Sequence, residues 1–478
     1  MNTAVLVCCE KRDGAVASEA VVIVDDLCTR PEQIAELTVD ADELVLGLHR
    51  DAYALADVQT QCRAAGFDPL GVPIIERGLL TEPTIAPAVL AGASARAAFF
   101  EESRPEQTKP VFPKRMTRRS LLGLPKPEYV GVPAIDHAVC AASDGCSACA
   151  DVCPKDAYRI VSGQVIYDKA ACDPCGRCVT VCPTGAIVNP VATPAQIAAQ
   201  IDGIAGAAAM PVGIAYVCRR RTVAAPPPPW VEVEVPCTGM VTGTWLLAPL
   251  LRGAAAVSLV PCSHSGCPLG HDVVVAGVVS FAHELLTSYG LDASRVAVAP
   301  SPTELAAPFP IVDVDDAFEL HGGPGVILGL VATRDVDAPA PSVEHPSAPV
   351  AVVEVDPSAC TLCLSCTQAC PTSALGHTEE EDLLTLTFDS ASCTACGQCV
   401  PSCPEVRRGA IRLAPRADEA ALTGGRVTLH AAEALRCASC GAPIASSAMM
   451  DRIGSLLGDE YEATMGYLTK YCMDCRGA

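Results

Sequence analysis

The chain has 478 residues, enough for three or more domains; half of the residues are apolar and 18% are charged. This composition predicts a globular protein with several cores and excludes a disordered chain. The formal net charge of −22 disfavours phosphate backbones and anionic membrane surfaces, so no nucleic-acid partner is expected. The 28 cysteines are too many for an ordinary intracellular enzyme and too dispersed for a small disulfide scaffold, so their spacing decides the class of protein.

Residues 1–103 alternate short β-branched runs with helical stretches. The pattern predicts strands over 4–7, 21–24, 44–48 and 72–75, and helices over 31–37, 54–65 and 83–99. Strands that alternate with helices indicate a small parallel α/β domain. Residues 104–135 are rich in proline and carry a basic run, and we predict a linker there.

Residues 136–190 and 350–415 each hold two runs of closely spaced cysteines. The runs that begin at Cys172, Cys360 and Cys393 have the spacing Cys-x2-Cys-x2-Cys-x3-Cys-Pro, which is the bacterial ferredoxin pattern. The first run, from Cys140, places five residues before Cys146, and this longer loop is expected to change the hydrogen bonds to its sulfurs. Zinc binds isolated Cys-x2-Cys pairs but poorly explains three consecutive pairs with a following Cys-Pro, so the runs predict two ferredoxin modules.

In modules of this kind the fourth cysteine of each run ligates the cluster of the other run. Applied here, the rule assigns sixteen cysteines to four 4Fe–4S clusters. The predicted ligand sets are Cys140, Cys146, Cys149 and Cys182; Cys172, Cys175, Cys178 and Cys153; Cys360, Cys363, Cys366 and Cys403; and Cys393, Cys396, Cys399 and Cys370.

Between the two modules, residues 191–334 return to α/β alternation and are predicted to form a second small parallel domain. Cys218, Cys237 and Cys262 end predicted strands, and Cys267 follows in the next loop. Ligands of an open α/β sheet gather beyond the carboxyl ends of its strands, so the four thiols are expected to converge. The alternative is four buried structural cysteines.

The motifs of this central region follow one another in a distinct order: a strand ending in Cys, a strand followed by Cys-Thr-Gly, then Val260-Pro-Cys-Ser-His-Ser-Gly-Cys267 and a helix near Gly270. In this order the region resembles the delta subunit of methyl-viologen-reducing hydrogenase. That family carries a 2Fe–2S cluster and passes electrons to heterodisulfide reductase. The resemblance implies that Cys218, Cys237, Cys262 and Cys267 are the cluster ligands. The N-terminal domain is similar to the leading segment of the heterodisulfide reductase A subunit, around residues 44–49 and 61–76.

The two α/β regions also resemble one another if Cys9 is matched to Cys218, because each then has Cys-Thr nineteen residues later. The third strand of the N-terminal region ends in Leu48-His49, where the central region has Pro261-Cys262. The third cysteine is therefore missing, and we predict a vestigial domain without a cluster. A cluster held by Cys8, Cys9, Cys28 and His49 is the alternative.

Residues 335–349 are predicted to form a second linker. A tail with cysteine pairs near both of its ends covers residues 431–478. Its two Cys-x2-Cys pairs stand on either side of a helical stretch over 445–457. Such pairs form a tetrahedral four-thiolate site. Cys437, Cys440, Cys472 and Cys475 are thus predicted to bind one zinc ion, with an additional iron–sulfur site or unmetallated thiols as alternatives.

The sequence contains no dinucleotide fingerprint after a strand, no P-loop, no zinc-protease motif and no nucleophile elbow, so no catalytic residue is predicted. Neither a signal peptide nor a membrane span is visible, and we expect a cytoplasmic protein. We interpret the chain as a non-catalytic electron-transfer subunit of a larger oxidoreductase whose partners are flavoprotein, hydrogenase or molybdopterin subunits. The central domain, lying between the two modules in sequence, is expected to be their junction. The alternatives are a self-contained heterodisulfide or thiol–disulfide reductase and a free polyferredoxin shuttle.

Overall fold

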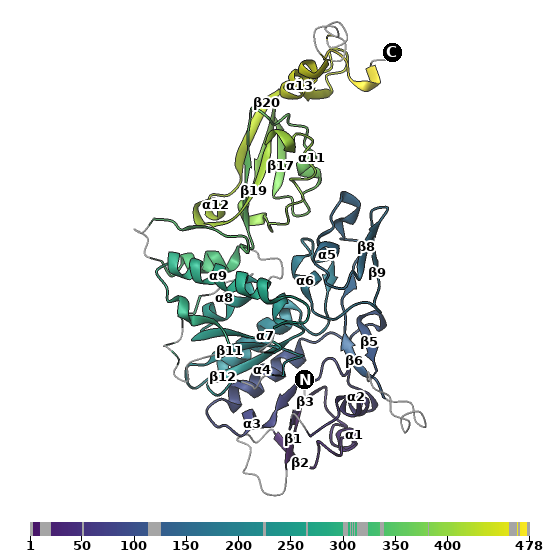
Figure 1. Ribbon diagram of the computed structural model, residues 1–478, viewed down its shortest axis with the longest axis vertical. Coiled ribbons are helices and arrows are strands. Elements are labelled where there is room, and N and C mark those ends of the chain that lie inside the picture. Colours follow the sequence, from purple (N-terminus) through teal and green to yellow (C-terminus); the bar gives the residue numbers. More distant parts are fainter. Residues whose placement is uncertain are drawn as a thin grey trace.

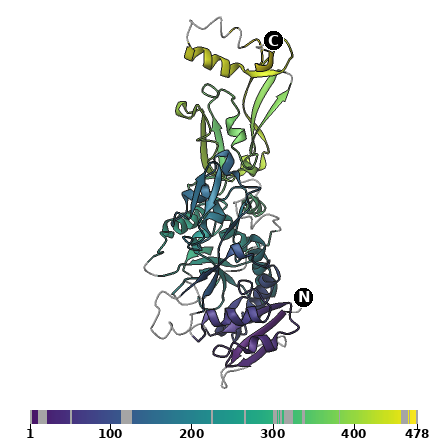
Figure 2. The same cartoon turned by 90° about the vertical axis from the view of Figure 1, so that its right-hand side faces the viewer.

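The computed structural model describes residues 3–9, 21–49, 52–112, 126–222, 226–263, 266–299, 305, 307, 309, 311–312, 324–334, 339–380, 382–457, 466 and 469–475. The molecule is elongated, with the N-terminal domain at one end and the tail at the other (Figure 1, Figure 2). Much of the basic run predicted as part of the first linker, from Lys114 to Arg119, lies outside the described residues. Among those that are described, no helix is both long and apolar enough to cross a membrane.

The N-terminal domain is a four-stranded parallel sheet of order β2-β1-β3-β4. Its strands are β1 (Thr3–Cys9), β2 (Val21–Asp25), β3 (Glu43–Leu48) and β4 (Ile74–Glu76). Its helices are α1 (Gln33–Leu37), α2 (Leu55–Ala64), α3 (Arg77–Leu80) and α4 (Ala86–Ala98). All predicted elements are present, and among the described residues of this domain only the short α3 was not expected. The five residues after Glu43 in β3 are all buried, as expected for a parallel strand covered on both faces.

The central domain repeats this topology with a parallel sheet of order β12-β11-β13-β14. The strands are β11 (Gly213–Cys218), β12 (Trp230–Val235), β13 (Ala256–Val260) and β14 (Val296–Val298). The helices are α7 (Pro194–Ala207), α8 (Gly243–Leu251), α9 (Asp272–Ser288) and α10 (Gly325–Val331), with short turns η3 (Thr238–Met240) and η4 (Ala293–Arg295). Relative to the chain, the strand order is second, first, third, fourth in both domains, which supports an internal duplication.

The strand register corrects one detail of that duplication. Val7 pairs with Gly47 in the N-terminal sheet, and Val217 pairs with Val260 in the central sheet. With His49 taken as the counterpart of Cys262, the residue equivalent to Cys218 is Cys8, not Cys9. Sequence spacing alone favoured Cys9 because Cys28 follows Val24, the partner of Cys8, by four residues, whereas Cys237 follows Val235, the partner of Cys218, by two.

The first ferredoxin module (residues 136–190) is a compact unit beside the central domain (Figure 1). It contains the hairpin β8 (Tyr158–Val161) and β9 (Gln164–Tyr167), the helices α5 (Ala148–Asp151) and α6 (Arg177–Val181), and β10 (Ile187–Val188). β10 pairs antiparallel with β7 (Ala134–Ile135). The extra residues in the spacer after Cys140 form a single 3-10 turn, η2 (Ala141–Asp144).

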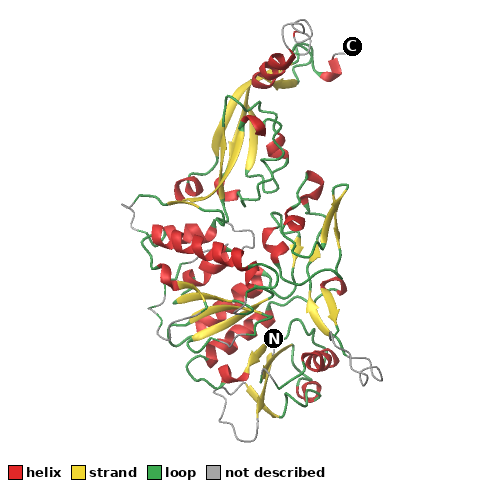
Figure 3. Ribbon diagram, in the orientation of Figure 1, coloured by secondary structure: helices red, strands yellow, loops and turns green. Residues whose placement is uncertain are grey.

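The second ferredoxin module shares a sheet with the tail, of order β17-β18-β20-β21 (Figure 3). These strands are β17 (Leu375–Glu380), β18 (Leu383–Phe388), β20 (Val427–Arg436) and β21 (Pro443–Ser446). The module also contains β16 (Ala351–Val355), β19 (Ile411–Asp418), α11 (Ser365–Gln368), α12 (Glu419–Thr423), η5 (Ser390–Ser392) and η6 (Val406–Arg408). The tail adds α13 (Ser447–Leu457) and η8 (Met473–Cys475). Because β20 runs through both parts, the tail is fixed to the module by backbone pairing.

The two segments predicted as linkers contain short strands among their described residues. Within 104–135, η1 (Pro105–Gln107) is followed by β5 (Thr108–Val111), which pairs antiparallel with β6 (Glu128–Gly131). Within 335–349, β15 (Ser342–Glu344) pairs with β19. In the first segment Lys109 donates to the backbone carbonyl of Cys172 at 2.7 Å. One basic residue of that segment therefore binds the first ferredoxin module of the same chain.

Candidate metal centres

The thiols of the first module gather in two groups. Burial raises the pKa of Cys149 to about 12, and the nearby Cys146, Cys182 and Cys140 raise it further. Burial also raises the pKa of Cys175 to about 11, with contributions from Cys172 and Cys153. In both groups the run's own cysteines meet the fourth cysteine of the other run, which is the arrangement the cross-ligation rule requires.

The second module repeats the arrangement. Burial raises the pKa of Cys366 to about 12, and its thiol neighbours are Cys360, Cys363 and Cys403. Burial likewise raises the pKa of Cys399 to about 12, and the thiols around it include Cys393, Cys396 and Cys370. A cavity opens among the first four, lined by Cys360, Cys363, Cys366 and Cys403 with Leu362, Leu364 and Ile411.

Hydrogen-bond donors already point at several of these sulfurs. The backbone N–H of Ala157 donates to Cys153 at 3.3 Å, and that of Leu375 donates to Cys370 at 3.4 Å, so the two modules share this contact. In the first module the hydroxyl of Tyr158 lies 3.3 Å from the sulfur of Cys178. Donors of this kind stabilise thiolates and tune the potential of any cluster bound to them.

The central quartet converges at the carboxyl ends of the strands. Cys218 is the last residue of β11, while Cys237 and Cys262 follow β12 and β13 by two residues. A hydrogen bond with Cys237 is the main cause that lowers the pKa of Cys218 to about 6, and Cys262 contributes to the same shift. Burial raises the pKa of Cys262 to about 11, and the nearby Cys218 and Cys267 raise it further. The four thiols are therefore neighbours, although they contain no Cys-x2-Cys pair.

His271 is a fifth donor at this site that the sequence analysis missed. Its Nδ1 lies 3.3 Å from the sulfur of Cys237, and the side chain is buried. The ligand atoms of Cys237, Cys267 and His271 lie within 4.8 Å of one another. The signal was present in the sequence as Cys267-Pro-Leu-Gly-His271, in which the histidine follows a predicted ligand by four residues at the start of a helix.

In the N-terminal domain the corresponding thiols are also close. The backbone N–H of Cys28 donates to the sulfur of Cys8 at 3.3 Å, and that of His49 donates to the sulfur of Cys28 at 3.2 Å. Burial raises the pKa of Cys28 to about 12, so this thiol stays protonated at neutral pH. The side chain of Cys9 lies outside the described residues.

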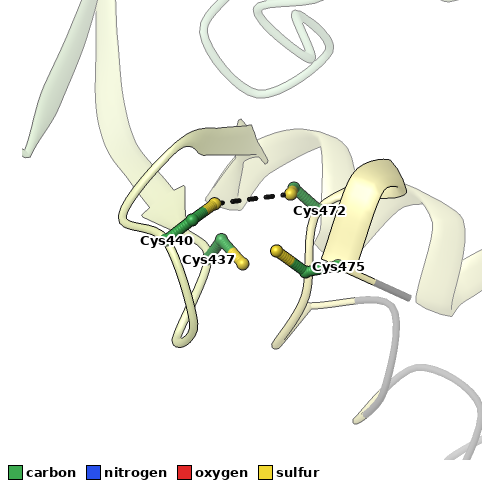
Figure 4. Close-up of side chains that lie close together, drawn as sticks. All are labelled: Cys437, Cys440, Cys472 and Cys475. Carbon is green, nitrogen blue, oxygen red and sulfur yellow. Dashed lines mark hydrogen bonds between the residues drawn. The ribbon is translucent and has the colours of Figure 1, made fainter. Parts of the chain in front are cut away.

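The four cysteines of the tail point toward one another and form a close thiol group (Figure 4). Their sulfurs all lie within 4.8 Å of one another, and those of Cys440 and Cys472 are 3.6 Å apart. Tetrahedral thiolates on one zinc ion, each about 2.3 Å from the metal, are separated by about 3.8 Å. The group therefore has the dimensions of a single-ion site. Backbone N–H groups, chiefly that of Cys472, lower the pKa of Cys437 to about 6.

The first module touches the central quartet directly. A side chain at Gly176, which follows Cys175, would meet Met240 in the turn after Cys237. Burial lowers the pKa of Arg177, and the charges of Cys175 and Cys237 raise it, so this guanidinium lies near both thiols. Arg220 and Asp173 form an ion pair across the same contact.

The first module also meets the second. Ala148 and Asp151 of the first module and Thr394, Cys396 and Gln398 of the second line one cavity together with residues of the central domain. Burial raises the pKa of Cys146, and Cys396 of the other module adds to the increase. At the far side of the second module, Ser446 donates to the carbonyl of Thr361 at 2.5 Å and Arg452 pairs with Glu405 at 3.2 Å, which holds the tail against the loops of Cys360 and Cys403.

Two parallel α/β domains and two ferredoxin-type modules with clustered thiols define a multi-domain iron–sulfur protein. Residues 221–311 match the family model of the methyl-viologen-reducing hydrogenase delta subunit. Residues 352–404 match a 4Fe–4S dicluster domain, and residues 164–187 match a 4Fe–4S binding domain. Comparison with curated proteins finds no significant match. The chain is thus an iron–sulfur protein similar to the hydrogenase delta subunit, as the cysteine motifs predicted.

Proposed function

We propose that this chain is an electron-transfer subunit of a cytoplasmic oxidoreductase complex, with four 4Fe–4S clusters, one 2Fe–2S cluster and one zinc ion. The sixteen ferredoxin cysteines hold the cubanes in the cross-ligated sets, the central quartet holds the two-iron cluster, and the tail cysteines hold zinc. Iron–sulfur clusters supply reversible one-electron chemistry. The residues of the chain set their spacing, exclude water around the thiols and donate hydrogen bonds to the sulfurs.

The observation that carries the proposal is a series of contacts between the domains that hold the thiol groups. Met240 and Arg177 connect the central quartet to the Cys175 group of the first module. A shared cavity connects that module to Cys396 of the second. These contacts support the order central domain, first module, second module, tail, with the first module as the proposed junction.

A second candidate function has one observation in its favour. The pKa of Cys218 is lowered to about 6 beside Cys237, as in a reactive dithiol. Both thiols are buried, however, with exposed fractions of 2% and 4%, so a disulfide substrate has no direct access to either sulfur. A thiol–disulfide reductase is thus the weaker proposal, and a free polyferredoxin shuttle is the third.

The partners that suit a series of one-electron sites are subunits with a flavin, hydrogenase or molybdopterin centre. The supporting resemblance is to a hydrogenase subunit, matched over residues 221–311. Purification of the native complex, with its subunits in fixed proportions, would identify these partners. A chain recovered alone from its cells would favour the free polyferredoxin shuttle.

The direct test is anaerobic purification of the full chain, followed by iron, sulfide and zinc analysis. The proposal requires about 18 iron atoms, from four clusters of four and one of two. Dithionite should reduce the protein, viologen dyes should reoxidise it, and disulfides, formate, hydrogen and nicotinamide should give no turnover. About 8 iron atoms with all cysteines intact would contradict the two-module assignment. Disulfide turnover abolished by Cys218→Ser would favour the reductase.

A further inference from the structure

The central site brings together five donor side chains, whereas a two-iron cluster needs four. We propose that His271 is a positioning residue that donates a hydrogen bond from Nδ1 to the thiolate of Cys237 and thereby raises the reduction potential of the central site. The inference rests on the proposed function, because it takes the four cysteines as the ligands of a 2Fe–2S cluster.

The geometry of the pair suits a hydrogen bond. Nδ1 of His271 lies 3.3 Å from the sulfur of Cys237, and the backbone N–H of Gly239 donates to the same sulfur at 3.4 Å. A metal-bound cysteine is a thiolate and carries no proton. It can only accept, so the proton of the contact has to reside on Nδ1, which fixes the tautomer of His271.

The surrounding packing holds the imidazole in this position. Only 6% of His271 is exposed, and its ring lies against Gly239 so closely that a Cβ there would be 2.6 Å from Nδ1. His271 immediately precedes α9, and the first residue of that helix, Asp272, accepts the backbone N–H of Cys267 through its carboxylate at 2.7 Å. The start of α9 therefore contacts one ligand through a side chain and another through its backbone.

The sign of the effect follows from charge. Reduction adds negative charge to the iron and sulfur atoms, so a donor to a ligand sulfur stabilises the reduced state more than the oxidised one. Burial strengthens this preference because water does not compete for the sulfur. Loss of the His271 donor should lower the reduction potential of the central site while the four thiolates still hold the iron.

The experiment uses the full chain, loaded with iron and sulfide, and follows the two-iron signal by electron paramagnetic resonance during a redox titration. His271→Leu removes the donor and should shift the midpoint potential downward with full iron content; His271→Gln keeps an N–H and should restore part of the shift. Gly239→Ala, which displaces the ring, should shift it in the same direction as His271→Leu. The matched control is His283→Gln on the same helix, because the Nε2 of His283 lies 2.7 Å from the backbone carbonyl of Val296 and not beside a cysteine sulfur.

A second measurement does not depend on any variant. Pulsed resonance of the unaltered chain labelled with ¹⁵N-histidine should show weak nitrogen coupling, and a proton that exchanges in D₂O. Strong coupling of the kind that directly bound imidazole gives would overturn the proposal by making His271 a ligand in place of one cysteine. An unchanged potential in fully loaded His271→Leu would overturn it as well. A chain without any two-iron signal would instead contradict the cluster assignment on which the inference rests.

Discussion

Gly176 of the first ferredoxin module lies directly against the side chain of Met240 in the central domain. An added Cβ at Gly176 would be 2.7 Å from the Sδ of Met240, so this glycine permits the close approach of two thiol groups. It also has a φ of 76°, in the left-handed region that favours glycine.

The contact predicts a specific loss of stability. Gly176→Asn should destabilise the protein by about 1–3 kcal/mol more than a substitution whose only cost is the strain of a positive φ, because overpacking forces the two domains apart. The second module offers the control: Gly397 occupies the same place between two cysteines and also has a φ of 76°, but its nearest neighbour, Leu413, would be 4.0 Å away. The thermal unfolding midpoints of Gly176→Asn and Gly397→Asn provide the comparison. Equal unfolding midpoints would mean that overpacking against Met240 does not lower the stability.

Cross-ligation predicts that loss of the fourth cysteine of one run removes the cluster held by the other run. Cys182→Ala should lower the iron content by about four atoms and remove the cluster of Cys140, Cys146 and Cys149. Cys62→Ala is the control, since Cys62 is packed in the core of the N-terminal domain. Iron analysis and the number of reducible cubanes decide the outcome. Loss of the Cys172 cluster instead would show that each run ligates its own iron.

The hydroxyl of Tyr158 should tune the Cys172 cluster. Tyr158→Phe removes a donor 3.3 Å from the sulfur of Cys178, so the potential of that cluster should fall without loss of iron. Tyr216→Phe is a matched control, because this buried hydroxyl donates to the carbonyl of Trp245 at 2.9 Å and not to a cysteine. Redox titration of both variants tests the prediction, and equal potentials would exclude a tuning role for Tyr158.

The tail should bind its metal at neutral pH and lose it in acid. The pKa of Cys437 is lowered from 9.0 to about 6, so its thiolate form dominates at pH 7, and protons compete with the metal as the pH falls through about 6. The stability linked to this thiol is accordingly fully present above pH 9 and is lost as the pH falls through the folded-state value. Zinc transfer to a chelator, followed against pH, measures this. Cys437→Ser should lack the ion at every pH, and iron in place of zinc would make the tail a redox site.

The N-terminal domain should hold no cluster. Cys28→Ser is expected to leave the iron content and all iron–sulfur signals of the full chain unchanged, because His49 stands where the central domain has Cys262. Loss of iron from this variant would show that Cys8, Cys28 and His49 form a working site.

Much of this protein could be predicted from its sequence because the relevant interactions are local. The Cys-x2-Cys spacing places three thiols on one tight loop, and the alternation of apolar runs determines strands and helices over a few residues each. The elements of the N-terminal domain, the repeated α/β topology and the convergence of Cys218, Cys237, Cys262 and Cys267 all follow from such patterns. Their role as ligands stays a prediction.

Other features depend on contacts between residues far apart in the chain, which no local pattern encodes. The equivalence of Cys8 with Cys218 is fixed by strand register, and register depends on how whole strands pair. The hydrogen bond between His271 and Cys237 spans 34 residues and requires α9 to begin beside the turn of Gly239. The order of the thiol groups depends on docking between folded domains, where burial of side chains such as Met240 against Gly176 decides which surfaces meet. For these features the amino-acid sequence supplied the residues, and only the tertiary structure decided which of them lie together.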